Sequence, residues 1–198
     1  MVIWSERMIA GEIACQTLAK KCVVLVDNCN WTGHECDVLG VTTDLRIIDV
    51  EVKISRADLK ADAGKDKWWR HLTWQDAEAR GIDTRTWNPW KHREPREWPP
   101  KVWKHYYALP ADIWRDDLIE ALPSPKSGVL LLSQKPGEFM RVDCRRRATP
   151  NKDATRLTAS NVMDIARLAN LRMWDAYRDA ERAKKDADYW RRQVKVAA

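Results

Sequence analysis

Helix-like and strand-like patterns of apolar residues follow one another along the chain. Apolar residues recur at helical spacing between residues 5 and 21, and Ser5 can cap that helix. Short β-branched runs predict strands, and two of them joined by a turn predict a hairpin. Ser55 can cap the helix after the hairpin. The first elements expected are a helix over 5–21, strands over 22–26, 37–42 and 45–54, and a helix over 56–63.

Residues 64–101 interrupt these patterns. The segment is polar, contains four prolines and is rich in tryptophan, so we expect an insertion with one short helix near residues 74–80. After it we expect a strand over 103–109, a helix over 113–121, strands over 128–133 and 139–145, and a long charged helix over 161–195. This order predicts an α/β fold, with a mixed central sheet flanked by helices in a core of residues 1–150 and a C-terminal helical extension over 151–198.

Composition and charge narrow the class of protein. The chain has 198 residues, 44% of them hydrophobic and 32% charged, with a formal net charge of +6, which excludes a mainly disordered chain. No apolar run approaches the ~20 residues of a membrane span, and charged residues interrupt the start of the chain where a signal peptide is apolar. We therefore expect a cytoplasmic protein that does not enter a membrane. We interpret its five cysteines as small buried residues, because none are spaced as in common zinc sites.

Three charged residues alternate with apolar ones on the last strand of the predicted hairpin. Asp49, Glu51 and Lys53 project from one face of that strand, and apolar residues occupy the other face. A solvent-exposed strand explains such a pattern, but the run is apolar enough to be central, and buried charge needs a partner. Asp37 on the neighbouring strand can converge on the same point. Two carboxylates and a lysine predict a hydrolytic site for Mg²⁺ or Mn²⁺.

These residues resemble the signature of the PD-(D/E)XK nuclease superfamily, which here is Asp37 followed by Glu51-Val-Lys53. The likeness is more specific to the MmcB-like DNA repair branch, including its phage-encoded members, and covers roughly residues 5–148 without the insertion. It rests on the stretches Asp37–Val41, Asp49–Asp62, His105–Pro110 and Gly128–Leu132. The resemblance implies a restriction-endonuclease-like core and metal-dependent cleavage of DNA in repair or processing.

The resemblance also implies roles for individual residues. Asp37 and Glu51 would be metal ligands, and Lys53 would be the catalytic lysine. Glu12 matches a position from which many members of the superfamily reach the metal through water, while a solvated helix face is an equally open alternative. The Trp-rich insertion departs from the compact lysine-rich segment of the family, which puts the substrate geometry in doubt.

Two further groups of residues have two interpretations each. Asp58 and Asp62 lie four residues apart on one helix, so they either support Lys53 or Lys65 or lie on a surface helix, and the second interpretation is preferred. Single histidines are more often structural than catalytic, although His105 lies on a strand that can line the cleft.

The insertion combines aromatic and basic residues. Six of the 12 tryptophans lie between residues 68 and 98. They either stack on unpaired bases or form a small core, and we prefer a core for any single one while expecting at least one exposed base-stacking ring. Residues expected to contact DNA, single-stranded or branched, are Lys65, Lys67, Trp68, Trp69, Arg70, Arg145, Arg146 and Arg147.

The long C-terminal helix has apolar residues at mixed three- and four-residue spacing in its first half. That half can pack on the core, whereas the charged second half projects, pairs with a second copy to form a homodimer, or lies on DNA. Taken together, the sequence predicts a Mg²⁺- or Mn²⁺-dependent deoxyribonuclease. The alternatives are a non-cleaving protein on the same fold that binds DNA or a host nuclease, and a structural protein that acts through the insertion and the last helix.

Overall fold

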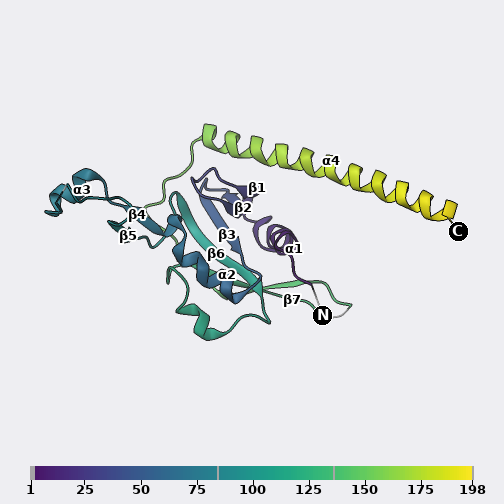
Figure 1. Cartoon of the computed structure of the whole chain (residues 1–198), viewed down its shortest axis with the longest axis horizontal. Coiled ribbons are helices and arrows are strands. Elements are labelled where there is room, and N and C mark those ends of the chain that lie inside the picture. Colours follow the sequence, from purple (N-terminus) through teal and green to yellow (C-terminus); the bar gives the residue numbers. More distant parts are fainter. Residues whose placement is uncertain (1–2, 84, 136, 198) are drawn as a thin grey trace.

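A mixed six-stranded sheet lies at the centre of the protein, with strand order β1-β2-β3-β6-β7-β8 (Figure 1). The computed structural model describes residues 3–83, 85–135 and 137–197, with side chains described through residue 193. The β3–β6 and β6–β7 pairs are parallel, and the remaining pairs of this sheet are antiparallel. The strands are β1 (Cys22–Cys29), β2 (Cys36–Thr42), β3 (Ile47–Val52), β6 (Val102–Pro110), β7 (Gly128–Ser133) and β8 (Arg141–Arg146).

Helices cover both faces of this sheet. Helix α1 (Glu6–Glu12) begins at the predicted cap Ser5 and continues into a π-helical turn over Ile13–Leu18. It packs through Ile9 against Val50 on one face. Helix α2 (Arg56–Ala61) begins at Ser55, as predicted, and its Leu59 belongs to a separate buried cluster with Tyr107. Because Tyr107 lies beside Glu51 in the parallel β3–β6 register, the predicted catalytic strand presents its charged side chains beneath α2.

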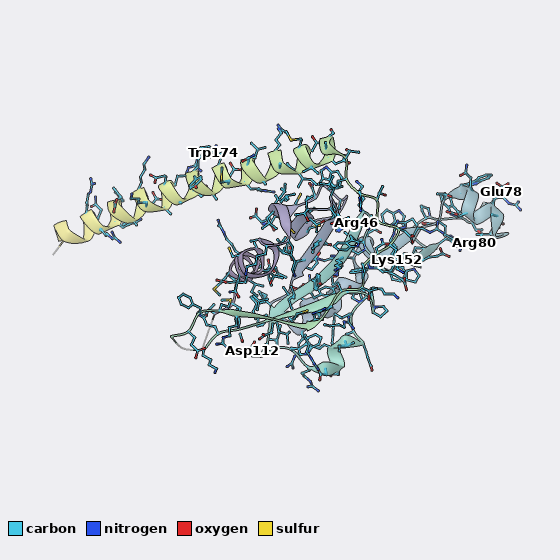
Figure 2. All side chains as sticks on the ribbon, turned by 180° about the vertical axis from the view of Figure 1, so that it is seen from behind. Arg46, Glu78, Arg80, Asp112, Lys152 and Trp174 are labelled. Carbon is cyan, nitrogen blue, oxygen red and sulfur yellow. The ribbon has the colours of Figure 1, made fainter. Side chains whose placement is uncertain are left out.

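The C-terminal helix α4 (Ala159–Ala197) packs on β1 with its first turns and then projects away from the sheet (Figure 1). Ile165 is fully buried in a cluster with Leu39 and Val41. The projecting part is largely exposed, and Figure 2 shows Trp174 partway along it. In the part of the chain that is described, no helix is both long and apolar enough to cross a membrane.

The insertion forms its own small substructure. Strands β4 (Trp69–His71) and β5 (Arg93–Pro95) pair in an antiparallel two-stranded sheet, and helix α3 (Trp74–Ala79) follows β4 with a capping box at its start. This confirms the predicted insertion and its short helix. Figure 1 shows it extending from the central sheet in the direction opposite to the free end of α4, and Figure 2 places Glu78 and Arg80 at its far end.

Two elements differ from the sequence prediction. The helix expected over 113–121 is only a 3₁₀ turn at Asp116–Ile119, since Pro110 and Pro123 bound the segment. The Asp116 carboxylate accepts bonds from the side chains of Trp114 and of Arg145 on β8. Strand β1 continues past its predicted end to Cys29, because pairing with Cys36 on β2 satisfies the backbone of residues that otherwise favour turns.

The five cysteines are all free thiols. Cys29 and Cys36 are buried, which confirms the prediction for these two residues. Cys15 and Cys144 are exposed, so the prediction of burial is wrong for them. Cys144 lies on β8, which has only β7 as a neighbour in the sheet and is solvated along much of its length.

Candidate active site

The alternation of charge on β3 places three ionisable side chains on the face of the sheet that α2 covers. Asp49, Glu51 and Lys53 are 0%, 2% and 3% exposed. A solvated strand face is therefore excluded for these residues. Groups this deeply buried must find partners, because an unpaired charge is costly away from water.

Asp37 lies next to Glu51, at the start of β2. One oxygen of its carboxylate accepts the backbone N–H of Val52 at 2.6 Å, so the side chain bridges to β3 one residue beyond Glu51. Burial, and after it the negative charge of Glu51, raise the pKa of Asp37 to about 7. The two carboxylates that the sequence predicted to converge are therefore electrostatic neighbours.

Three lysines surround the carboxylate of Glu51. Lys53 Nζ lies 3.1 Å and Lys65 Nζ 3.4 Å from Glu51 Oε2, and Lys67 pairs with Oε1. Burial alone raises the pKa of Glu51, but the attraction of Lys67 and Lys53 outweighs it, and the net shift is downward. Glu51 is therefore held ionised in a cage of ammonium groups, of which only Lys65 is substantially exposed, at 49% of its side chain.

Asp62 is the second anion of this cage. It is fully buried and lies 3.1 Å from Lys53 Nζ and 3.0 Å from Lys65 Nζ. It also accepts the indole N–H of Trp68 at 2.9 Å and the hydroxyl of Tyr107 at 2.6 Å. The preferred interpretation of Asp62 as a surface residue is wrong, because the end of α2 turns this carboxylate inward onto Lys53.

Asp58 behaves differently although it lies on the same helix. Its side chain is 39% exposed, and its carboxylate lies 3.7 Å from Lys53 Nζ. The two aspartates thus differ in burial even though they lie four residues apart. The cause is the end of the α-helix, where the chain tightens into a 3₁₀ turn at Asp62.

The contacts of Glu12 do not bring it to the Asp37–Glu51 pair. Its carboxylate accepts the side-chain amide of Gln16 at 2.5 Å. The same amide donates to the backbone carbonyl of Met140 at 2.8 Å, which ties this part of the first helix to the segment before β8. A role of Glu12 as a water-mediated metal ligand stays a prediction.

The predicted DNA contacts fall into two groups. Lys67 and Trp68 are 6% and 2% exposed and are bound to Glu51 and Asp62, so neither can contact DNA in this arrangement. The prediction of DNA contact is therefore wrong for these two residues, because the carboxylates of Glu51 and Asp62 hold them inside the protein. The other predicted contacts are at least partly exposed, namely Lys65, Trp69, Arg70, Arg145, Arg146 and Arg147.

Some of these exposed cations already have protein partners. Arg70 pairs with Glu94 at 2.9 Å within the insertion, and Arg145 pairs with Asp116 at 2.8 Å. The guanidinium of Arg146 donates to the backbone carbonyl of Ser127 at 2.9 Å. Exposed ion pairs such as those of Arg70 and Arg145 contribute little to stability.

The tryptophans of the insertion are divided between the two expected environments. Trp68 is part of the core and packs edge-on against His105 at 4.9 Å between ring centroids. Trp74 and Trp90 are 48% and 70% exposed. The interpretation as a core therefore holds for Trp68, and the expected exposed rings are present in the outer part of the insertion.

A groove of about 640 Å³ adjoins the predicted site. It runs between α1, the edge strand β1 and the middle of α4, and Asp37 lines it. Its lining is of mixed charge, with Arg7 and Arg172 alongside the acidic residues Glu6, Asp27, Asp175 and Asp179. Asp37 is therefore the member of the carboxylate pair that is directed toward open space.

Sequence reasoning missed a second cluster of residues beside this site. His34, Cys36 and Asp49 bring one ligand atom each to within 4.8 Å of one another. The available signal was the His-X-Cys spacing at residues 34–36, one residue before the predicted ligand Asp37. The spacing of the cysteines alone does not reveal this cluster, because common zinc sites contain closely spaced cysteine pairs.

The comparisons with known proteins define the fold but no function. No family model and no curated protein matches the chain. Among solved structures, the chain is similar to the SPO1766 protein of unknown function from Silicibacter pomeroyi, with a TM-score of 0.52 and 18% identity over 91% of this chain and 96% of that one. At this identity the likeness shows a shared fold and nothing more. In this chain the fold is a six-stranded mixed sheet with helices, together with a small two-stranded insertion and a long C-terminal helix.

Proposed function

We propose that the protein is a metal-dependent nuclease that hydrolyses phosphodiester bonds in DNA, on a PD-(D/E)XK core of the restriction-endonuclease type. The observation that supports this most strongly is the meeting of Asp37, Glu51 and Lys53 at the ends of β2 and β3. The resemblance of these residues to the superfamily signature agrees with that geometry. The proposal also includes Mg²⁺ or Mn²⁺ as the cofactor and DNA as the substrate.

The residues fit a hard divalent cation. Asp37 and Glu51 are both oxygen donors, and their mutual repulsion is part of the reason that the pKa of Asp37 is high. A cation held between them removes that repulsion, and Lys65 is the exposed ammonium that it would displace from Glu51. When bound, the ion supplies Lewis acidity that polarises a phosphate and lowers the pKa of a bound water.

Lys53 acts as a fixed positive charge rather than as a base. Burial lowers the pKa of its ammonium, but Glu51 and Asp62 outweigh this effect and raise the pKa above its ordinary value. Lys53 therefore stays protonated at neutral pH. Its charge is suited to stabilising the negative charge that develops on the phosphate in the transition state.

Asp62 positions Lys53 for this role. It is 3.1 Å from Lys53 Nζ and is itself held by Trp68 and Tyr107. The lysine thus has one anchor on its own strand and a second on the end of α2. Such double anchoring restricts the ammonium to one orientation, which reduces the reorganisation needed during the reaction.

A second candidate function has an observation of its own. Both oxygens of Glu51 are paired with lysines, which resembles a closed structural cage more than an open catalytic site. A nuclease-like module that binds DNA without cutting it fits this arrangement. Cleavage measured with and without a divalent cation separates the two functions.

The experiment is to incubate the full chain with plasmid DNA and with a labelled single-stranded oligonucleotide, in Mg²⁺, in Mn²⁺ and in EDTA. We expect cleavage with either cation and none in EDTA. Asp37→Asn and Glu51→Gln should lose cleavage, whereas Asp27→Asn should keep it. Asp27 is a matched control because it lines the same groove on the neighbouring strand β1.

Three results would contradict the proposal. Cleavage that persists in EDTA excludes the metal mechanism. Equal cleavage by Asp37→Asn and Asp27→Asn excludes the carboxylate pair. Salt-sensitive DNA binding without cleavage under any of these conditions supports the non-cleaving function instead.

A further inference from the structure

The cluster formed by His34, Cys36 and Asp49 adjoins the proposed nuclease site, because Asp49 lies two residues before Glu51 on β3. His34 belongs to the connection between β1 and β2, Cys36 begins β2, and Asp49 lies on β3. Cys36 and Asp49 are 0% exposed, and the side chain of His34 is 11% exposed. His105, also fully buried, stands beside Asp49 in the β3–β6 register.

The ligand atoms of the three side chains lie within 4.8 Å of one another, and two of the three separations are close to those around one ion. His34 Nε2 lies 3.2 Å from Asp49 Oδ2 and 3.7 Å from Cys36 Sγ. Tetrahedral zinc, with its ordinary bond lengths to nitrogen, oxygen and sulfur, places neighbouring ligand atoms about 3.3–3.6 Å apart. The three side chains therefore need little movement to share one ion.

The hydrogen bonds around the cluster orient the imidazole of His34. The hydroxyl of Thr32 donates to the backbone carbonyl of His34 at 2.9 Å. The same hydroxyl oxygen lies 3.2 Å from Nδ1 of His34, while Nε2 of that ring lies 3.2 Å from Asp49 Oδ2. This contact is a direct hydrogen bond when Nε2 carries the proton, and a metal ion between the two atoms would take the place of that proton. An outer partner on Nδ1 is also what metal-binding histidines commonly have.

Two buried polar atoms next to the cluster have no hydrogen-bond partner among the described residues. They are Asp49 Oδ1 and His105 Nε2. Nδ1 of His105 is hydrogen-bonded to the hydroxyl of Ser127 at 3.0 Å, and its Nε2 lies 3.8 Å from Asp49 Oδ2. Buried polar atoms are rarely left without a partner, and an ion at this place supplies one.

We propose that His34, Cys36 and Asp49 bind a transition metal ion of the zinc type, with His105 beside the remaining coordination position. One nitrogen, one sulfur and one oxygen donor favour zinc or cobalt over magnesium, which prefers oxygen alone. This site is thus chemically distinct from the all-oxygen pair Asp37 and Glu51. The proposal does not depend on nuclease activity, and the partly exposed side of His34 is the route by which the ion enters.

The test is a titration of the EDTA-stripped, reduced full chain with Co²⁺, whose spectrum reports its ligands. We expect one equivalent to give visible d–d bands together with a thiolate-to-cobalt charge-transfer band, both lost when Zn²⁺ is added and unaffected by excess Mg²⁺. Cys36→Ser should abolish the charge-transfer band. Cys29→Ser should retain this band. It is the matched control because Cys29 is also a buried free cysteine and lies opposite Cys36 in the β1–β2 register.

Two further variants keep the outcome clear if Cys36→Ser folds poorly. His34→Ala alters the most exposed ligand and should weaken Co²⁺ binding at least tenfold, with an unchanged far-ultraviolet circular dichroism spectrum. Glu51→Gln should leave the cobalt spectrum intact even if it abolishes DNA cleavage. Absence of the charge-transfer band in the wild type, or its persistence in Cys36→Ser, overturns the proposal and leaves a hydrogen-bonded His34–Asp49 pair as the explanation.

Discussion

Replacing Asp62 tests whether the buried cluster of lysines and carboxylates around Glu51 holds Lys53 in place. In Asp62→Ala, the indole N–H of Trp68 and the hydroxyl of Tyr107 lose a buried acceptor. Each buried donor left without a partner costs about 1–3 kcal/mol. Lys53 keeps its pairing with Glu51, so its charge is not left alone. The two donors together predict a loss of about 2–6 kcal/mol of unfolding free energy, which brackets the about 3–5 kcal/mol seen when a buried ion pair is broken.

Asp58→Ala is the matched control for this prediction. Asp58 is the same residue type on the same helix, but it is 39% exposed and 3.7 Å from Lys53 Nζ. Lys53 keeps Glu51 and Asp62 when Asp58 is removed, and a partly solvated carboxylate at this distance contributes about 0–1 kcal/mol. Urea unfolding followed by far-ultraviolet circular dichroism measures both variants, and the midpoint should shift strongly for Asp62→Ala only.

The pH dependence gives the same prediction a second check. Burial raises the pKa of Asp62, but Lys67 and Tyr107 outweigh it and the net shift is downward. A carboxylate with a lowered folded-state pKa stabilises the protein above its unfolded pKa of about 3.9 and loses that contribution as the pH falls. The difference between the wild type and Asp62→Ala should therefore be full at pH 7 and shrink below about pH 4. Equal losses of unfolding free energy in Asp62→Ala and Asp58→Ala at pH 7 would refute the interpretation of Asp62 as a buried anchor of Lys53.

Three other outcomes are expected. The pKa of Asp37 is raised to about 7. In EDTA, the contribution of Asp37 to stability is therefore greatest below pH 4 and is lost as the pH rises through 7. Asp37→Asn should remove this part of the pH dependence of urea unfolding. Trp74→Ala combined with Trp90→Ala should weaken single-stranded DNA binding by about 1–3 kcal/mol per stacked base and reduce fluorescence quenching, while melting is unchanged; unaltered affinity would assign the rings another role. A chain ending at residue 180 should melt within a few degrees of the full chain, because the removed side chains that the structure describes, at 181–193, are almost all exposed. A large drop in melting temperature would contradict this.

The sequence predicted the backbone of the site because its signals are local. The alternation of Asp49, Glu51 and Lys53 with apolar residues fixed one strand and its two faces, and Ser55 fixed the start of the following helix. The structure confirms both. These predictions need only the two-residue period of a strand and the preference of serine for a helix start.

The parts that were missed depend on contacts between distant residues. Lys67 and Trp68 look like surface residues in a basic, aromatic segment, but Glu51 and Asp62 draw them into the core. The burial of Asp62 arises where α2 tightens into a 3₁₀ turn, which residue spacing on an ideal helix does not show. His34 reaches its partners across a strand connection, and no spacing rule describes that geometry.

The most direct test of the nuclease proposal is the rate of Mn²⁺-dependent DNA cleavage by Lys53→Met, measured beside Lys60→Met at a temperature at which both variants are folded. Lys60 lies on the exposed side of α2 and controls for the loss of one positive charge. We expect Lys53→Met to lose cleavage by about 10²-fold or more, because the ammonium stabilises the transition state. This variant should still bind DNA, and Lys60→Met should cleave like the wild type. Equal cleavage by the two variants would contradict the assignment of Lys53.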